Sequence, residues 1–363
     1  MGLTWPLLAL ILESQGVSSS LIGLSSASQS LAVFAAAPAA PRLILRFGMV
    51  RTLAGCVAVA VTALLLLPLY ANVYAWFPIR FLLGASTMIL FIGCETWVNQ
   101  IAAEASRGRV IGIFGFLWSA GFVAGPLIIR ITGIEGWTPF LAGVALIVIA
   151  ALPLPLARDV APAIKGRATG GILRFVRLAP AVLLAAPLLG AVDYINDSFL
   201  PLYAMHHGLS QASAVTLLAV LQAGVTLSHP PVGWLADRMD RRRLLLATTG
   251  VTLVLALALP GVVGHPWLLW PVVLIWGTAI GGIWTVAVVL LGERFRGSDL
   301  AGALAASSVL YGFGSVGGPS LAGFAMDAWD PLAIPLLIAL VCLLYLPVTL
   351  VRERGHADGA EKV

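Results

Sequence analysis

Two aspartates and an asparagine lie within one apolar stretch of the chain, as Asp193, Asn196 and Asp197. Spacings of three and four residues place these side chains on one face of an α-helix. Ionisable residues are rare inside membrane-spanning helices, and those that occur mark solute pathways and proton relays. We therefore predict that this face couples transport to protons or binds the solute. The alternative is a solvated position near the outer membrane surface, which fits Asp197 better than the deeper Asp193.

Two further charged residues, Arg80 and Glu95, interrupt another apolar stretch. An arginine at such depth needs a partner or a water-filled cavity. Alternatively, its long side chain extends to the nearby outer surface. Glu95 binds a cation or a proton, or it pairs with Arg107 or Arg109 at the interface. Both interpretations stay open for each residue, and we rank the pair as second candidates after the two aspartates.

The elements that position these side chains are membrane-spanning helices. Of the 363 residues, 60% are hydrophobic and only 10% are charged, and the mean hydropathy is +1.00. A soluble domain carries about a quarter charged residues. The composition therefore predicts an all-α integral membrane protein. The net charge of +5 comes from basic residues between apolar segments, so no nucleic-acid partner is expected.

Eleven complete spans are expected from the apolar stretches of roughly 20 residues that a bilayer requires. The segment from Met1 to Ile11 precedes them, and its helical length is only about 16 Å. We expect it to be the remainder of a truncated first helix, which gives twelve transmembrane helices. The complete spans are expected at 19–41, 53–71, 75–98, 109–130, 137–157, 180–204, 212–235, 244–264, 267–292, 300–325 and 331–351.

An internal repeat relates the two halves of the chain. With one constant offset, Gly16, Ser18, Pro38, Arg46 and Arg51 align with Gly208, Ser210, Pro230, Arg238 and Arg243. One residue further, Gly84, Gly125 and Pro126 align with Gly277, Gly318 and Pro319. Repeats of this kind build transporter folds. They predict a first six-helix bundle at 1–157, a cytoplasmic linker at 158–178, a second bundle at 179–352 and a cytoplasmic tail at 353–363.

Basic residues predict the orientation in the membrane. All 21 Lys and Arg residues except Arg80 and Arg130 lie in the loops after the even-numbered helices or in the tail. Loops rich in Lys and Arg stay in the cytoplasm. Both termini of this multi-pass protein are therefore expected on the cytoplasmic side of the cell's inner membrane.

One of these basic loops carries a motif, Gly-Trp-Leu-Ala-Asp-Arg-Met-Asp-Arg-Arg-Arg over 233–243. It resembles the loop signature of the major facilitator superfamily, with Asp240 in place of the second Gly. Gly233 is expected to permit close helix approach, Asp237 to pair with basic neighbours, and Arg238 and Arg241 to anchor the loop on the cytoplasmic face. An ordinary basic loop that only sets topology is the alternative.

The first-half copy of this motif keeps Arg46, Gly48 and Arg51, but it has Leu45 where the family pattern has Asp. A conformational latch that needs this carboxylate is therefore expected in the second copy alone.

Three shorter patterns also resemble the superfamily. Arg80 and Gly84 match an Arg-x-x-x-Gly pattern that is linked in family members to proton or substrate handling. Gly112, Gly121, Gly125 and Pro126 resemble its antiporter signature, although Ile129-Arg130 replaces the trailing glycines, and a plain packing face explains them equally well. Glu-Thr-Trp-Val-Asn over 95–99, followed by Arg-Gly-Arg over 107–109, resembles a sub-group of bacterial facilitators.

The resemblance covers the chain from Leu10 onward and implies a secondary active transporter that is usually monomeric. Its two bundles would rock about a central cavity and move a small molecule across the lipid bilayer, with no cofactor or metal. The antiporter-like glycines favour proton-coupled efflux, and symport or uniport is the alternative. A non-transporting sensor is less expected. So is a membrane-embedded enzyme, because no loop exceeds about 20 residues or holds a catalytic constellation.

Overall fold

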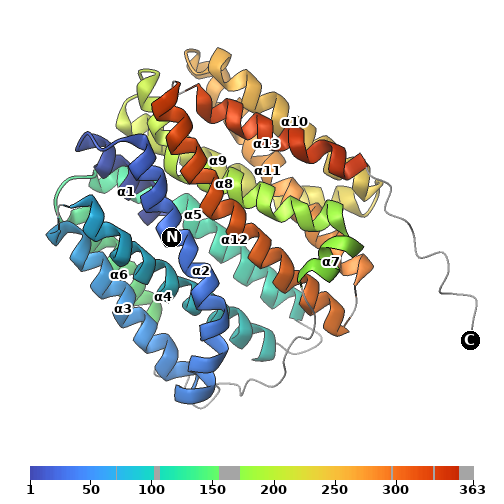
Figure 1. Cartoon of the computed structure of the whole chain (residues 1–363), viewed down its shortest axis with the longest axis horizontal. Coiled ribbons are helices and arrows are strands. Elements are labelled where there is room, and N and C mark those ends of the chain that lie inside the picture. The colour runs from blue at the N-terminus through green and yellow to red at the C-terminus, as the bar shows by residue number, and fades with distance from the viewer. Residues whose placement is uncertain (71, 102–106, 155–171, 296, 330–331, 351–363) are drawn as a thin grey trace, which may run out of the picture.

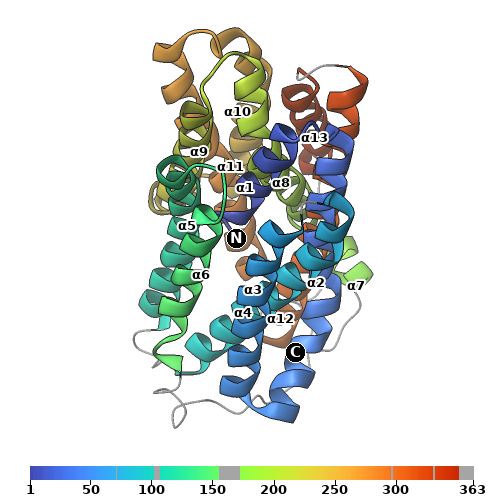
Figure 2. The same cartoon turned by 90° about the vertical axis from the view of Figure 1, so that its left-hand side faces the viewer.

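The computed structural model describes residues 1–363 except 71, 102–106, 155–171, 296, 330–331 and 351–363. The described residues form thirteen α-helices and no strand, and the helices pack as one bundle of tilted rods (Figures 1 and 2). The helices are α1 (Thr4–Ser14), α2 (Ser19–Phe47), α3 (Met49–Leu69), α4 (Val73–Ile101), α5 (Arg107–Thr132), α6 (Thr138–Ala151), α7 (Ile172–Leu178), α8 (Pro180–His206), α9 (Gln211–Ala236), α10 (Arg241–Val262), α11 (Pro266–Arg294), α12 (Gly297–Ala328) and α13 (Ala333–Leu350).

Eight helices among the described residues are long and apolar enough to cross a membrane, judged by length and composition. They are α2, α3, α4, α5, α8, α9, α10 and α11. Shorter apolar helices include α1 and α6. The predicted all-helical membrane fold is confirmed.

The turns after α1 and α8 show the internal repeat in the backbone. Gly16 and Gly208 both have positive φ, at 73° and 88°, a conformation that glycine adopts without steric cost. Two residues later, Ser18 and Ser210 cap the next helix. The Ser18 hydroxyl accepts a hydrogen bond from the Leu21 amide at 3.4 Å, and the Ser210 hydroxyl accepts one from the Ser213 amide at 3.2 Å. The repeated residues thus perform the same local task in each half.

The repeat also extends to helix packing. A Cβ atom added at Gly84 of α4 would collide with the carbonyl oxygen of Gln29 in α2. A Cβ added at Gly277 of α11 would collide with the carbonyl oxygen of Leu221 in α9. Because both neighbours are backbone atoms that cannot turn away, only glycine allows these two helix pairs to pack so closely.

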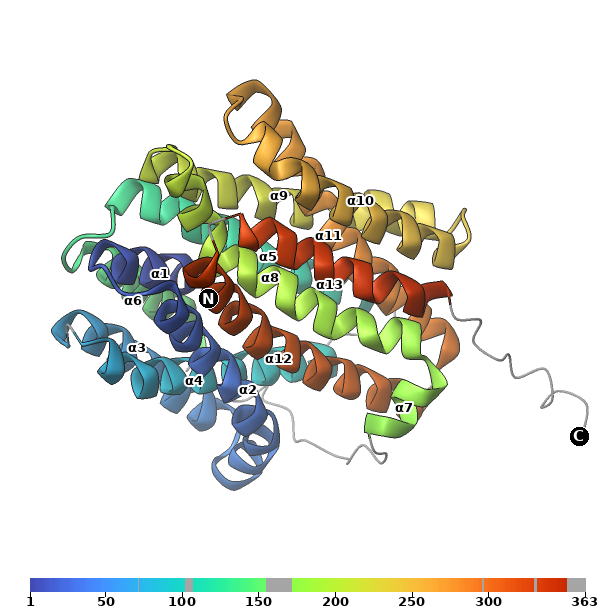
Figure 3. The same cartoon turned by 45° about the horizontal axis from the view of Figure 1, so that its top comes forward.

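The first six helices meet the last six mainly where α2 packs on α12 and α5 packs on α9, with α1 against α8 between them. Two glycines bring α2 and α12 together. A Cβ at Gly23 would collide with the carbonyl oxygen of Pro319, and a Cβ at Gly323 would collide with that of Ser19. We call this line of contacts the α2–α12 seam. With the two halves packed in this way, the middle of α8 lies at the centre of the molecule (Figures 1 and 3).

The segment expected to be a linker contains a helix that the sequence analysis missed. Helix α7 packs against α8 and α12, at the end of α12 where that helix begins (Figures 1 and 3). Phe175 anchors it, because its side chain is 1% exposed and packs edge-on against Phe295 at 5.5 Å between ring centroids. The rest of the expected linker, up to residue 171, and the expected tail lie outside the described residues.

Candidate transport site

The two aspartates of α8 lie near the middle of the bundle, where Asp197 is buried and Asp193 is partly buried, and they contact different helices. The Tyr311 hydroxyl of α12 donates a hydrogen bond to Asp193 Oδ2 at 2.9 Å. Gln222 Nε2 of α9 donates to Asp197 Oδ1 at 2.7 Å. Asp197 is only 3% exposed, so the structure does not place it at a solvated surface. Each carboxyl group therefore joins α8 to one neighbouring helix.

Asn196 lies on α8 beside Asp197 and is fully buried. Neither its Nδ2 nor its Oδ1 has a hydrogen-bond partner among the described residues. An unsatisfied buried amide is costly. A polar ligand atom or a water molecule that reached this amide would recover part of that cost.

Arg80 of α4 is completely buried, so its side chain does not extend to the surface. Its guanidinium donates to Ser25 Oγ and Ser26 Oγ of α2, both at 3.2 Å. It also lies over the Trp5 ring of α1, at 5.5 Å from the ring centroid. The partners that an arginine requires inside an apolar helix bundle are thus two hydroxyls and an aromatic face.

A short polar chain connects Arg80 to the aspartate-bearing helix. The Ser198 hydroxyl of α8 donates to Ser26 Oγ at 3.2 Å, and Ser26 in turn receives a hydrogen bond from Arg80. Ser198 follows Asp197 directly in the chain. The structure therefore brings the predicted Arg80 and the predicted face of α8 together through Ser26.

Several members of this polar centre were missed by the sequence analysis, namely Ser25, Ser26, Ser198, Gln222 and Tyr311. The sequence did contain one signal for Ser25 and Ser26. They belong to the run Ser-Ser-Ala-Ser-Gln-Ser over 25–30, which is unusually polar for an apolar helix.

Aromatic rings from four helices surround the same region. Trp5 of α1 meets Tyr194 of α8 edge-on at 4.4 Å between ring centroids. Tyr194 lies 6.0 Å from Tyr311 of α12, which lies 6.2 Å from Trp284 of α11. Asp193 is thus flanked by rings, and one of them, Tyr311, also donates its hydrogen bond.

Glu95 does not join this centre. It lies on α4 about 22 Å along the helix axis from Arg80, and its side chain is exposed. The side chains of Arg107 and Arg109, with which it was expected to pair, lie outside the described residues.

The loop between α9 and α10 is organised by the motif residues. Arg241 Nε donates to the Ala236 carbonyl at 3.0 Å, and its guanidinium contacts Glu293 at the end of α11 and lies 4.0 Å from Asp237. The pairing predicted for Asp237 is therefore present as a long contact. Arg238 lies over the Trp234 ring, at 4.0 Å from its centroid.

One residue of the motif differs from expectation, and a second has a role that the sequence analysis did not predict. Gly233 was predicted to permit a close helix approach, and this is wrong, because a Cβ there would meet no atom within 4 Å. Asp240, which replaces the family's second Gly, accepts a hydrogen bond from the Arg243 amide at 2.8 Å and so caps α10. The substitution exchanges a flexible residue for a helix cap.

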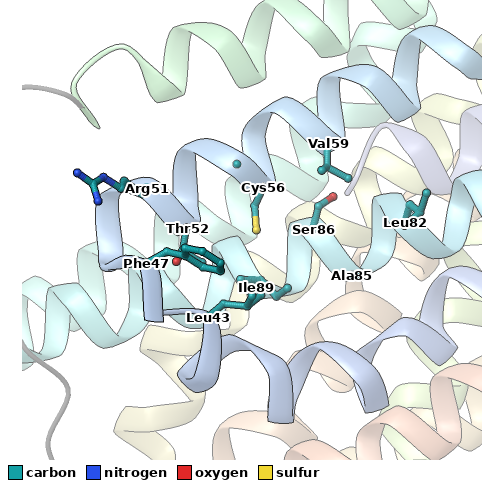
Figure 4. Close-up of a pocket in the computed structure, with 11 residues that line it drawn as sticks. Leu43, Phe47, Arg51, Thr52, Cys56, Val59, Leu82, Ala85, Ser86 and Ile89 are labelled. Atoms are coloured by element: carbon teal, nitrogen blue, oxygen red, sulfur yellow. The ribbon is translucent and has the colours of Figure 1, made fainter. Parts of the chain in front are cut away.

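The first-half copy of the motif lies between α2 and α3. Gly48 has a φ of 83° and links the two helices, and Arg46 lies over the Phe47 ring at 5.2 Å from its centroid. Arg51 stands at one end of an apolar cavity of about 400 Å³ between α2, α3 and α4 (Figure 4). This cavity is built by the first six helices alone and is separate from the polar centre around Asp193.

The predicted motif residues of α5 contact the start of the chain. A Cβ at Gly125 would collide with the backbone of Gly2 and Leu3, and Gly2 itself approaches the carbonyl oxygen of Gly121. Pro126 follows within the helix and is buried. The geometry fits the packing interpretation of these glycines.

The Major Facilitator Superfamily sequence profile matches residues 1–285 and 224–362, so this chain belongs to that superfamily. It is a multi-pass membrane transporter and not an enzyme.

Relatives of the chain are bacterial transporters. It is 25% identical over 338 residues to the uncharacterized MFS-type transporter YfkF of Bacillus subtilis (strain 168), covering 91% of this chain and 85% of YfkF. It is 24% identical over 299 residues to the uncharacterized MFS-type transporter YcaD of Escherichia fergusonii, covering 81% of this chain and 76% of YcaD.

Solved structures share the fold. The crystal structure of a point mutant of the nucleoside transporter NupG has a TM-score of 0.79 at 16% identity and covers 96% of this chain and 95% of NupG. A bacterial homolog of the human lysosomal transporter Spinster, in an inward-facing and unoccupied conformation, has a TM-score of 0.74 at 15% identity and covers 96% of this chain and 90% of the homolog. The predicted major-facilitator fold is thereby confirmed.

Proposed function

We propose that this chain is a secondary active transporter that exports a small solute in exchange for protons by alternating access. The observation that carries the proposal is the polar centre formed by the partly buried Asp193 and the buried Asp197 and Arg80. Ionisable groups are costly inside a membrane, so they are retained where they bind ions or solutes. Here they sit where the first six helices meet the last six, which is where transporters of this kind bind their solute.

The moving parts in this proposal are two bundles, at 1–157 and 179–352. The α2–α12 seam and the α5–α9 contact form the surfaces on which they rock. Loops rich in Arg favour an orientation in which Arg51 and Arg241 lie on the cytoplasmic side of the inner membrane. The opposite end of the bundle, where α2 begins and α12 ends, then faces outward, and we call it the Asp327 end.

Three polar contacts join the two bundles at the Asp327 end. Asp327 accepts hydrogen bonds from the amides of Ser19 and Ser20 at 2.9 and 2.8 Å. Glu13 Oε1 lies 3.2 Å from His206 Nε2, and Arg130 Nη1 donates to Thr216 Oγ1 at 3.0 Å. These contacts support a conformation that is closed toward the outside, in which solute would enter the centre from the cytoplasm.

The exchange step uses Asp193. In its charged form, the carboxylate accepts the Tyr311 hydroxyl and can attract a solute. After the bundles rock and open outward, a proton from outside neutralises the carboxylate and weakens its hold on the solute, which leaves. Rocking back carries the proton to the cytoplasm. One carboxylate that is occupied alternately by solute and proton is sufficient for antiport.

The test is proton movement in inverted membrane vesicles that contain the protein and a pH-sensitive dye. Organic cations, sugars, organic acids and nucleosides are added in turn, with Asp193→Asn beside the unchanged protein. The control is Glu135→Gln, an exposed carboxylate in the loop between α5 and α6. We expect solute-induced proton release from the vesicles in the unchanged protein and in the control, and none in Asp193→Asn.

Proton release that persists in Asp193→Asn would contradict the role of this carboxylate. Solute movement without any proton movement would contradict coupling and favour uniport. Proton movement in the same direction as the solute would instead establish symport.

A further inference from the structure

The surroundings of Asp193 indicate the charge of the solute. Asp193 lies near the middle of the 27-residue α8. Within the described part of the chain, its hydrogen-bond donor is the uncharged Tyr311 hydroxyl, and no Lys, Arg or His lies in an ion pair with it. A carboxylate in this position lacks the positive partner that a buried charge normally has. A cationic solute would supply that partner.

The buried arginine of the polar centre does not serve as this partner. Arg80 already directs its guanidinium at Ser25 and Ser26, and it occupies a face of the Trp5 ring. A solute anion at Asp193 would face two carboxylates, from Asp193 and Asp197, and none of the Arg80 contacts turns its guanidinium toward Asp193. This arrangement disfavours organic anions.

The rings beside Asp193 give the solute its second recognition element. Trp284 of α11 is 41% exposed although it lies within a helix that spans the membrane. It contacts the ring of Tyr311, which is itself bonded to Asp193. A cation that lies over an aromatic face is attracted by the ring's quadrupole, most strongly for tryptophan. The carboxylate and the partly exposed tryptophan are thus joined through Tyr311.

We propose that the solute is a lipophilic organic cation held between Asp193 and the rings of Trp284 and Tyr311, and that protons compete with it for Asp193. The inference rests on the proposed function, whose solute site it specifies. Apolar parts of the cation would contact the rings, while its charge would lie at the carboxylate.

Other titratable groups face Asp193 and influence how readily its carboxylate binds a proton. They are Asp197 and Tyr194 of α8 and Tyr311 of α12. The amino group of Met1 acts electrostatically on Asp197, one helical turn further along α8. Among the other helices packed on α8, α1 and α11 present the rings of Trp5 and Trp284.

Titratable groups elsewhere on these helices are engaged away from Asp193. Glu13 at the end of α1 pairs with His206 at the end of α8. His229 of α9 bonds to Thr285 of α11, and Tyr345 of α13 bonds to the carbonyl of Ala181 in the first turn of α8.

The test is binding of tetraphenylphosphonium to the purified full chain in detergent, with tetraphenylborate as a probe of the same size and opposite charge. Tetraphenylphosphonium should bind and tetraphenylborate should not. Asp193→Asn and Trp284→Ala should each weaken tetraphenylphosphonium binding about tenfold or more, because each removes one desolvated cation contact. Trp284→Phe keeps a weaker aromatic face and should retain part of the binding.

Matched controls separate recognition from unfolding. Trp267→Ala removes a 94% exposed tryptophan from the first turn of the same helix, and Glu135→Gln removes a loop carboxylate. Both should bind tetraphenylphosphonium as the unchanged protein does. Lowering the pH should weaken binding in the unchanged protein and leave the residual binding of Asp193→Asn unaffected.

Equal binding of the two probes, absence of tetraphenylphosphonium binding, or undiminished binding in Asp193→Asn would overturn the cation site. Because binding needs no gradient, the two proposals fail separately. Tetraphenylphosphonium binding that depends on Asp193, without any proton movement in vesicles, would sustain the cation site and reject coupled transport. Proton movement driven by another solute, without tetraphenylphosphonium binding, would do the reverse.

Discussion

Replacing Asp327 by Asn should weaken the contact that closes the outer end of the transporter. The carboxylate lies at the start of α2 and accepts three hydrogen bonds, two from the backbone amides of Ser19 and Ser20 and one from the Ser20 hydroxyl at 2.5 Å. Its negative charge also complements the positive end of the α2 helix dipole. Asparagine keeps the shape but loses the charge and one acceptor oxygen.

The free energy by which Asp327→Asn destabilises the closed conformation follows from these contacts. A hydrogen bond to a charged group contributes about 1.5–3 kcal/mol when it is well protected. Water competes at this exposed site, so the sum of the bonds and the dipole term must be discounted. A loss of about 1–2 kcal/mol is expected, which shifts the ratio of closed to open protein roughly 5- to 30-fold.

Distances between spin labels measure this shift. Leu69 at the end of α3 and Trp267 at the start of α11 are exposed positions of the two bundles at the Asp327 end. With Cys56, Cys94 and Cys342 replaced by alanine, a cysteine at each position carries a label. Asp327→Asn should increase the fraction of molecules that show the longer, outward-open distance.

The control is Glu135→Gln, which removes an exposed carboxylate from a loop at the same end. It should leave the distance distribution as it is. An unchanged distribution in Asp327→Asn, with the thermal midpoint preserved, would refute the assignment of this contact as a gate.

Two further predictions concern packing and capping. Gly23→Ala should lower the thermal midpoint, because its Cβ would collide with the Pro319 carbonyl and such overpacking costs about 1–3 kcal/mol. Gly233→Ala is the matched control, since nothing lies within 4 Å there, and an equal loss in both variants would contradict the reasoning. Asp240→Ala should cost about 1 kcal/mol by removing the bond to the Arg243 amide. Asp240→Asn should restore most of it in the same thermal assay, and no difference between the two would argue against a cap.

Much of the fold could be predicted because its signals are local. Hydropathy located the spans, and the internal repeat paired Gly16 with Gly208, which lie in two turns with the same backbone conformation. Helix α7 was missed because seven residues are too few for a periodicity to emerge from a polar linker. Its position depends on burial of Phe175 against Phe295, which is a long-range contact.

The candidate site was predictable only in part. Asp193 and Arg80 stood out because charge is rare in apolar helices. Their partners Ser26, Ser198 and Tyr311 did not stand out, because these residue types are common in membrane helices. Their role in the site depends on which side chains they contact in the folded structure. Helical spacing places residues on a face, but which helix covers that face is decided by tertiary packing.

The α2–α12 seam has a consequence for how transporters of this kind diversify. Its contacts at Gly23 and Gly323 are made by backbone atoms, so they do not depend on the size or charge of the solute. Substitutions there should change the turnover of all solutes by the same factor. Substitutions at Trp284, on a different helix, should change which solutes are chosen. Selection can therefore change the solute specificity without changing the turnover rate, and the two properties can be engineered one at a time.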